Sequence, residues 1–285
     1  MLKVIVAQLL CAIGVCLANP AIAKDEALRL APDSNWTADF AEDFCALRRN
    51  FANDDHLVFF EMKQVVPGQG FEVTIASNTL DRENGRFRTA FLPDDNPVRQ
   101  ENYRRVETTD GWDGFIYSDS LDPEGAEPPA TGSPEALARS SAITSYVIEG
   151  GFAADIVLET GPMNEVMNVR RQCTDGLVES WGLDPEEQRS LTRSVDYPEE
   201  NRWMRSLWQA MGEPSQRINQ FEALLLVDAG GRVTRCIPGI GTLDADRNEA
   251  GCAHLKDNAV FVPALDEAGA PIESYLSINI AMVGS

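Results

Sequence analysis

Cysteine is the residue type whose number and placement most directly predict a chemical bond in this chain. The sequence has six cysteines, and two of them, Cys11 and Cys16, lie in an apolar N-terminal segment. The other four are Cys45, Cys173, Cys236 and Cys252. Four cysteines allow three pairings, and an even number in an exported chain is typical of disulfides. We expect the pairs Cys45–Cys173 and Cys236–Cys252. A thiolate metal site is the alternative, which the absence of a Cys-x-x-Cys motif disfavours.

Acid–base chemistry has fewer candidate residues. The two histidines, His56 and His254, lie far apart in the sequence. There is no G-x-S-x-G, phosphate-loop, H-E-x-x-H or dinucleotide-binding motif. Residues 244–248 resemble the start of a calcium loop, but residues 249 and 255 are not the glycine and glutamate that such a loop needs. We therefore predict no catalytic residue, no metal and no cofactor. An enzyme of another class, acting on an envelope substrate, is the alternative.

The first 23 residues have the pattern of a secretory signal peptide. Lys3 supplies the positive charge, residues 4–18 form the apolar core, and Ala21 and Ala23 are the small residues of the cleavage site. We predict cleavage after Ala23 and a soluble periplasmic product, with an uncleaved membrane anchor as the alternative. No later stretch is long and apolar enough to span a bilayer.

The chain is strongly acidic, with a formal net charge of −21, and loss of the signal peptide with its one lysine would make this −22. Negative charge of this size repels nucleic acid and anionic lipid. We therefore exclude nucleic acid as a partner and expect no stable membrane contact after cleavage. A basic partner is compatible with this charge.

Alternating side chains predict a β-rich domain at residues 24–194. We expect four strands there, at residues 57–66, 71–76, 142–148 and 154–159. The first two alternate apolar and polar residues on either side of a Pro67-Gly68 turn, which predicts a β-meander. Residues 24–33, ahead of the meander, are expected to form a loose arm.

Two polar stretches interrupt this pattern. Residues 94–105 are highly charged, and we expect them to be irregular. Residues 110–133 are rich in Asp, Gly, Pro and Ser, which predicts a long exposed loop. Trp112, Phe115 and Tyr117 lie in this stretch. We expect these aromatic side chains to pack back on the core, with a binding surface as the alternative.

Two helices are predicted in the same domain. Ser133 followed by Pro134 is a good helix start, because serine caps the first turn and proline fits its first position. A longer helix is expected to begin after residues 160–162 and to end at Gly182. Its apolar face contains Met163, Met167, Cys173, Leu177 and Trp181. We expect this face to pack on the core rather than to form a methionine-lined groove, and Cys173 to fasten it to Cys45.

Residues 221–283 predict a compact C-terminal unit of strand, tight turn, strand, helix and strand. The turn, at residues 228–231, contains two glycines. Asp246 is the expected helix cap, with Glu249 three residues further on. The closing strand alternates, with Leu276, Ile278, Ile280 and Met282 on one face. We place the domain boundary near Ser194, so that this unit belongs to a domain at residues 195–285.

Several short motifs in this unit resemble the C-terminal domain of TonB-type energy transducers. They are Asp228-x-x-Gly231-x-Val233, Leu243-Asp244 at the helix start, Phe261-x-Pro263-Ala264 after the helix, and Gly269-x-Pro271 before the last strand. The resemblance covers about the last quarter of the chain. It implies a ββαβ fold whose last strand, here residues 272–282, is an edge that pairs with an extended peptide of an outer-membrane receptor. The edge residues that it implies are Ser274, Leu276, Ile278 and Ile280. Energy transduction is not implied, because the long Pro-rich spacer of those proteins is absent.

Two weaker resemblances concern the rest of the chain. Trp36, Cys45-x-Leu47 and the strands after them resemble the secreted β-sandwich of invasion-associated locus B proteins. Most of the mature chain also resembles a group of secreted alphaproteobacterial proteins, a likeness that implies no activity. We expect an α+β protein with an N-terminal β-rich domain, meander-like or sandwich-like and carrying one packed helix, and a C-terminal ββαβ TonB-like domain. The leading functional hypothesis is a periplasmic, non-enzymatic adaptor that pairs its edge strand with an envelope or outer-membrane protein. A purely structural envelope protein is the alternative.

Overall fold

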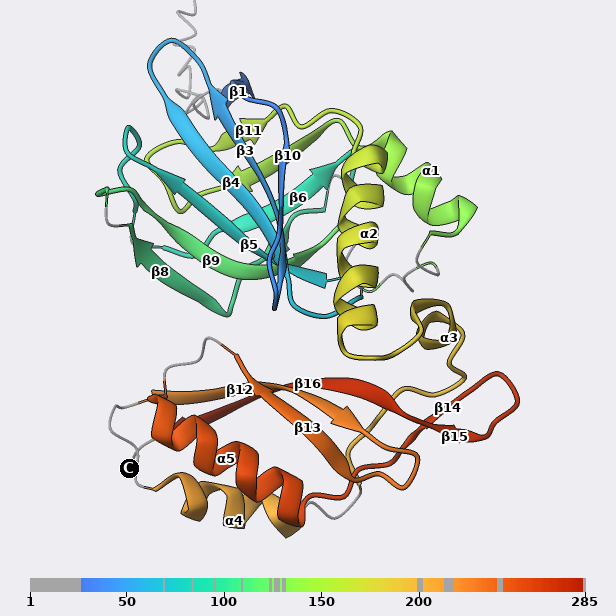
Figure 1. Cartoon of the computed structure of the whole chain (residues 1–285). Helices are drawn as coiled ribbons and strands as arrows, with labels where there is room; N and C mark the ends of the chain where they lie inside the picture. Colours follow the sequence, from blue (N-terminus) through green and yellow to red (C-terminus); the bar gives the residue numbers. More distant parts are fainter. Residues whose placement is uncertain are drawn as a thin grey trace, which may run out of the picture.

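A computed structural model describes residues 27–283 of the chain, apart from 69, 84, 95, 109, 123–124, 126–128, 130–131, 199–201, 213–217 and 240–242. The predicted signal peptide, with Cys11 and Cys16, lies outside the described residues. The fold is mixed α+β and rich in strands, as expected. Figure 1 shows a large curled sheet with α1 and α2 beside it, and a smaller sheet below it that is covered by α4 and α5.

In the described residues, eleven strands form the large sheet. Ten of them follow the spatial order β7-β6-β10-β11-β1-β3-β4-β5-β9-β8, and β2 pairs with β3 off this path. Their bounds are β1 Leu28–Pro32, β2 Thr37–Phe40, β3 Cys45–Ala52, β4 Leu57–Gln64, β5 Gly70–Ser77, β6 Arg88–Leu92, β7 Val98–Arg99, β8 Tyr103–Glu107, β9 Asp113–Ser120, β10 Ser145–Glu149 and β11 Ile156–Leu158.

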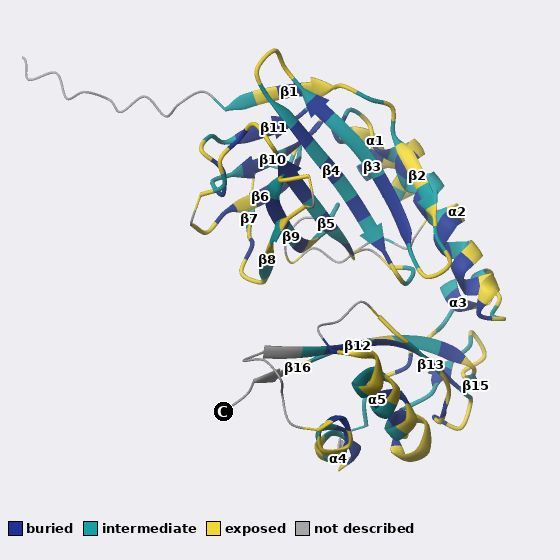
Figure 2. Ribbon diagram, turned by 60° about the vertical axis from the view of Figure 1, so that its left-hand side comes forward, coloured by how far each residue is buried: buried dark blue, intermediate teal, exposed yellow. Residues whose placement is uncertain are grey.

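The curl of this sheet encloses the first hydrophobic core. Strands β4 and β5 bury alternate residues, as a sheet with one covered face requires, and Figure 2 shows this alternation along β4. Phe51, Phe60, Phe115 and Tyr146 are among the largest fully buried side chains. Strand β1 joins the two halves of the sheet, since it pairs in parallel with β11 on one side and antiparallel with β3 on the other.

Three expectations for this domain are wrong. The predicted arm at residues 24–33 contains β1, and the predicted irregular stretch at 94–105 contains β7 and the start of β8. The predicted loop at 110–133 contains β9, which pairs with β5 over eight residues. Long-range pairing overrides the loop-like composition of β9. Phe115 and Tyr117 do pack into the core, with 0% and 2% of their surface exposed.

Both predicted helices of this domain are present. α1, Pro134–Ala142, begins at Ser133, whose side chain accepts a hydrogen bond from the Ala136 amide. α2, Asn164–Ser180, buries the predicted face, with Met163 in the first core and Leu177 and Trp181 in a separate cluster. The predicted Cys45–Cys173 disulfide joins α2 to the start of β3.

The second domain is built on a three-stranded antiparallel sheet in the order β13-β12-β16. The bounds of its strands are β12 Ile218–Val227, β13 Val233–Pro238 and β16 Ser274–Val283, with a small hairpin of β14 Ala264–Leu265 and β15 Pro271–Ile272. Its helices are α4, Arg202–Met211, and α5, Ala245–Asn258, while the short α3, Pro185–Arg189, follows α2 in the connection between the domains. The second core includes Leu207, Phe221, Leu225, Leu255 and Ile278.

Strand β13 contains a bulge that decides which of its side chains reach α5. Leu226 lies opposite Arg235 but Val227 lies opposite Val233, so Thr234 is an extra residue in the ladder. Simple alternation would put Val233 and Cys236 on opposite faces. The bulge brings both into the second core, and the predicted Cys236–Cys252 disulfide then ties β13 to α5.

Helix α5 is capped by a different residue from the one predicted. The Asp244 side chain accepts a hydrogen bond from the Arg247 amide, so Asp244 rather than Asp246 is the cap. Asp246 lies in the first turn, where its charge suits the positive end of the helix. The turn between β12 and β13 holds Gly231 at φ 82°, and a Cβ there would lie 2.1 Å from the Phe261 carbonyl oxygen. Only glycine fits this position without strain.

The two domains meet through a third apolar cluster. It combines Cys45, Cys173, Leu177, Val178 and Trp181 of the first domain with Leu224 and Leu226 of β12. The second core includes Val195, and Leu191, before the predicted boundary, also packs against it. The C-terminal sheet is therefore covered on both faces, by α4 and α5 on one side and, at Leu224 and Leu226, by the end of α2 on the other.

Candidate functional site

The last strand, β16, is an edge of its sheet. It pairs with β12 along its whole length, from Ser274 opposite Val227 to Val283 opposite Ile218. Within the described residues no strand pairs with its other side. Such an edge offers a row of backbone donors and acceptors to another extended chain. We call this side the outer edge of β16.

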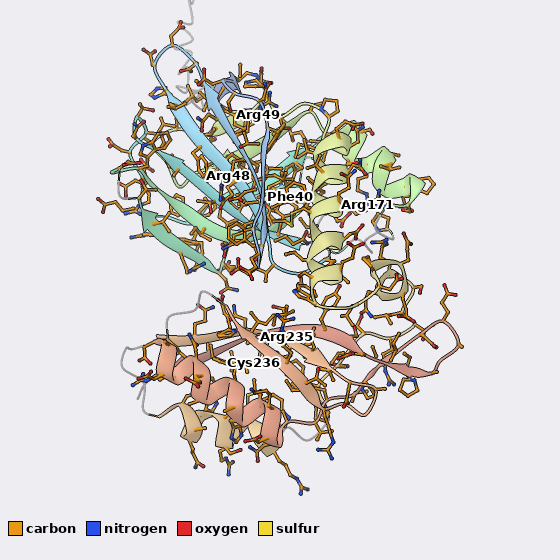
Figure 3. The ribbon with its side chains drawn as sticks, viewed as in Figure 1. Phe40, Arg48, Arg49, Arg171, Arg235 and Cys236 are labelled. Carbon is orange, nitrogen blue, oxygen red and sulfur yellow. A yellow bond between two sulfur atoms is a disulfide. The ribbon has the colours of Figure 1, made fainter. Side chains whose placement is uncertain are left out.

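The two edges of the small sheet differ in how they are protected. Natural edge strands are kept from pairing by lysine, proline, bulges or short length. β13 has six residues, a bulge at Thr234, a terminal Pro238 and the charged Arg235, and it is held by the Cys236 disulfide (Figure 3). β16 has ten residues, SYLSINIAMV, with no charge, proline or glycine. The chain thus protects one edge of this sheet and leaves the other open to pairing.

The predicted edge residues have their side chains in the protein rather than in solvent. Ile278 is 1% exposed and lies in the second core, with Leu276 and Ile280 packed against that core. Ser274 is 2% exposed, and its hydroxyl donates to Oε1 of Gln188 at 2.6 Å. The side chains of these four residues therefore position the strand and are not available to a partner. Among the described side chains of β16, those of Ser277, Asn279 and Ala281 are exposed.

The first domain holds the start of β16 in place. Gln188 of α3 donates from Nε2 to the Glu273 carbonyl oxygen at 3.0 Å. Tyr275 packs edge-on against Trp181, with ring centroids 5.2 Å apart. Burial raises the pKa of Tyr275 to about 12, so its hydroxyl stays neutral at physiological pH.

The structure does not bring the two histidines together, because His56 lies between β3 and β4 and His254 lies in the second domain. His254 lies on α5, where Nε2 is 3.0 Å from the Ser206 hydroxyl, and the Asn258 amide donates to its carbonyl oxygen. His56 follows a turn in which the Asn53 side chain accepts two backbone hydrogen bonds. No group of three or more metal-ligating side chains occurs in the described part of the chain. No described helix is long and apolar enough to cross a membrane.

One buried polar network lies inside the curled sheet. Oδ2 of Asp119 accepts hydrogen bonds from the hydroxyls of Tyr146 and Thr89. The Tyr117 and Tyr146 hydroxyls are 2.9 Å apart, and Gln100 donates to Thr89 at 2.7 Å. The network links β9 to β6 and β10 across the core. Each of these side chains has a hydrogen-bond partner within the network.

Asp119 makes stability depend on pH in a direction that can be tested. Burial raises the pKa of Asp119, and hydrogen bonds from Tyr146, Ser120 and Thr89 only partly oppose this. The unfolded chain therefore loses this proton at lower pH than the folded chain does. The proton on Asp119 therefore stabilises the folded state fully below the ordinary aspartate pKa. This stabilisation is lost as the pH rises through the pKa that Asp119 has in the folded chain. We expect wild type, compared with Asp119→Asn, to be relatively more stable at pH 4 than at pH 7 in urea unfolding. A stability difference between wild type and Asp119→Asn that is the same at both pH values would contradict this expectation.

Sequence analysis missed one buried cation. Arg170 lies on the inward face of α2, three residues after Met167 and three before Cys173, yet it is only 8% exposed. An arginine within an otherwise apolar helical stripe is the signal that could have revealed it.

Comparison with known proteins found no matching family model, no matching curated protein and no matching solved structure.

Proposed function

We propose that this chain is a secreted periplasmic, non-enzymatic adaptor with a TonB-like C-terminal domain, and that the outer edge of β16 pairs with an extended segment of an envelope or outer-membrane protein. The observation that carries the proposal is the ten-residue β16, which has no charge, proline or glycine and no partner strand on one side among the described residues. The order β12, β13, α5, β16 also agrees with the order that the TonB resemblance implies.

The contrast between the two edges supports partner binding over a general tolerance of open edges. An unprotected edge strand can cause aggregation, so proteins normally block such edges. An edge that is left unblocked is therefore expected to have a use, such as pairing with a partner. The chain protects β13 with Arg235, Pro238 and a disulfide, so the means of protection are present in the same sheet. Backbone pairing at β16 would supply affinity, while Ser277, Asn279 and Ala281 would contact alternate side chains of the partner.

The two disulfides support the proposed location. Both pairs are buried or half-buried within a folded core, Cys45 and Cys173 in one cluster and Cys236 and Cys252 in another. Disulfides of this kind persist in oxidising compartments such as the bacterial periplasm. This supports export of the chain before it folds.

A photo-crosslinking experiment tests the proposal. A benzophenone amino acid is placed at Ala281 on β16 or, as the control, at the exposed Ala253 on α5, and the full-length protein is illuminated in an envelope preparation of the organism that encodes it. We expect adducts from position 281 but not from position 253, with the crosslinked residues of the partner lying in one extended segment.

A charge on the edge provides the matched second test. Ser277→Lys puts a lysine beside the outer edge, where lysine opposes strand pairing, and Ala253→Lys adds the same charge elsewhere. We expect Ser277→Lys to reduce the yield of adducts at position 281 at least about tenfold and Ala253→Lys to leave it unchanged. Equal yields from both probe positions, or adducts insensitive to Ser277→Lys, would rule out strand addition.

A purely structural envelope protein is the second candidate, and the contact between the domains favours it. The C-terminal sheet packs through Leu224, Leu226 and Tyr275 against Leu177 and Trp181 of the first domain. A sheet whose second face is already covered by the first domain could have a purely structural role within this protein. Absence of any adduct above the background of position 253 would support this candidate.

A further inference from the structure

A pocket in the first domain gathers positive charge in an otherwise acidic protein. It lies between α1, α2, α3 and the turn after β4, and has a volume of about 170 Å³. Arg139, Arg170, Arg171 and Arg189 line it, together with two aspartates, Asp122 and Asp175. The whole chain has 45 acidic residues against 24 basic ones, so four arginines around one small cavity is a marked local reversal of charge.

Two of these arginines are neutralised within the protein and two are not. Arg139 forms ion pairs with Asp122 and Glu135, and Arg189 forms ion pairs with Asp175 and Glu186. Among the described residues, no carboxylate forms an ion pair with Arg170 or Arg171. Arg171 donates from Nη2 to the Asn168 side-chain oxygen at 3.0 Å. Arg170 and Arg171 are consecutive on α2, so two guanidinium groups without an ion pair among the described residues line the same pocket. The charge of Asp122 acts on Arg170 and partly offsets the effect of burial on its pKa.

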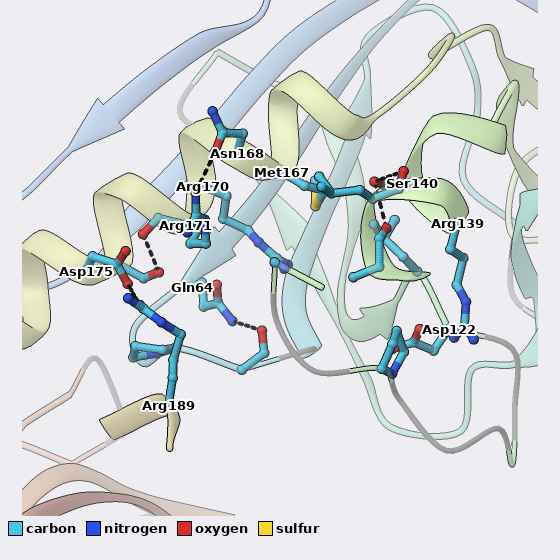
Figure 4. Close-up of a pocket in the computed structure, with 18 residues that line it drawn as sticks. Gln64, Asp122, Arg139, Ser140, Met167, Asn168, Arg170, Arg171, Asp175 and Arg189 are labelled. Carbon is cyan, nitrogen blue, oxygen red and sulfur yellow. Dashed lines mark hydrogen bonds and ion pairs between the residues drawn. The ribbon is translucent and has the colours of Figure 1, made fainter. Parts of the chain in front are cut away.

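Arg170 is the more informative of the two. Its side chain stacks on Phe71, with Cζ 5.3 Å from the ring centroid, and its Nη1 is buried without a hydrogen-bond partner. Figure 4 shows it extending from α2 into the space between the Asp175–Arg189 pair and the Asp122–Arg139 pair. Burial lowers the pKa of Arg170 to about 10, so the group stays charged at neutral pH. A buried charge without an acceptor is costly, and an anion in the pocket would remove that cost.

The rest of the lining limits what the anion can be. Leu121, Pro129, Ala136, Leu137 and Met167 give the pocket a mostly apolar wall. A cavity of about 150 Å³ is large enough for a benzene ring. A planar guanidinium fork matches the geometry of a carboxylate.

We propose that this pocket binds a small carboxylic acid with an apolar body, whose carboxylate is held by Arg170 and Arg171 and whose body lies against Leu121, Leu137 and Met167. The site is separate from the outer edge of β16, so the two proposals stand or fall independently. The ligand class follows from the guanidinium groups and from the cavity volume of about 170 Å³, which accommodates a body about the size of benzene.

Benzoate is the probe, and calorimetric titration of the full mature chain is the measurement. Benzyl alcohol has a similar body without the charge, and inorganic phosphate has the charge without the body. We expect benzoate to bind at least tenfold more tightly than either. Tight binding of phosphate alone, or equal binding of benzoate and benzyl alcohol, would overturn the proposal, as would no binding of benzoate at 10 mM.

Two substitutions identify the residues. Arg170→Met keeps the length and apolar stem of the side chain and removes the unpaired charge, so we expect the variant to fold at least as stably as wild type and to bind benzoate about 10- to 100-fold more weakly. Arg171→Gln, at a half-buried position, provides a second variant with little risk to folding. Arg29→Gln, on β1 and outside the pocket lining, is the control and should bind as wild type does. Unchanged binding in both pocket variants would refute the assignment.

Discussion

Replacing Cys45 and Cys173 together by alanine is expected to lower the free energy of unfolding by about 5 kcal/mol. The bond joins residues 128 positions apart, so its loss frees a very long loop in the unfolded chain. The same replacement of Cys236 and Cys252, which are 16 positions apart, is expected to cost about 3 kcal/mol. Since small domains are stable by only about 5–15 kcal/mol, the first double variant should lie close to unfolding.

Urea unfolding followed by far-ultraviolet circular dichroism measures this difference. The Cys236→Ala/Cys252→Ala variant is the matched control, because it removes the same atoms and closes a much shorter loop. The free energy of unfolding is expected to be highest for wild type, lower for the short-loop variant and lowest for the long-loop variant. A larger loss for the short loop would show that local packing, rather than the unfolded chain, controls the contribution of these bonds.

Tyr146→Phe is expected to cost about 3 kcal/mol of stability. Asp119 is buried in the first core and relies on the hydroxyls of Tyr146 and Thr89 and on the Ser120 amide for its hydrogen bonds. Removing one of these donors leaves a buried carboxylate with an unmet acceptor, which costs more than an ordinary hydrogen bond. The phenyl ring itself keeps its contacts with Phe60 and Phe91.

Tyr117→Phe is the control for this prediction. Its hydroxyl is bonded to the Tyr146 hydroxyl rather than to the carboxylate, so its loss should cost only about 1 kcal/mol. Both tyrosines are fully buried and lose the same single oxygen atom. Equal losses in the two variants, measured by urea unfolding at pH 7, would show that the negative charge of Asp119 does not govern the network.

Local patterns predicted the elements whose contacts are local. The spacing of Met163, Met167, Cys173, Leu177 and Trp181 predicted the inward face of α2. Ser133 predicted the start of α1, and the turn at Gly231 predicted the hairpin. Each of these signals depends on neighbours within a few residues, which is why a single sequence carries them.

Elements that depend on distant partners were missed. β1 looked like an arm because its partners are Ile156–Leu158 and the end of β3. β9 looked like a loop because Gly, Asp and Ser are uncommon in strands and its partner β5 is distant in the sequence. On β13, simple alternation predicted the wrong faces, because the bulge at Thr234 adds an extra residue opposite β12. Arg170 was overlooked because a charge in an apolar stripe says nothing by itself about a pocket formed with α1 and α3.

The position of β1 in the middle of the large sheet has a consequence for the timing of folding. This strand, among the first of the described residues to be synthesised, can pair with β3 early but with β11 only after Ile156–Leu158 has been made. At about 5–20 residues per second, ribosomes need roughly ten seconds to make the intervening chain. During that interval the sheet cannot close, and late, non-local closure of this kind slows folding. The large sheet therefore cannot be complete until residue 158 has been synthesised.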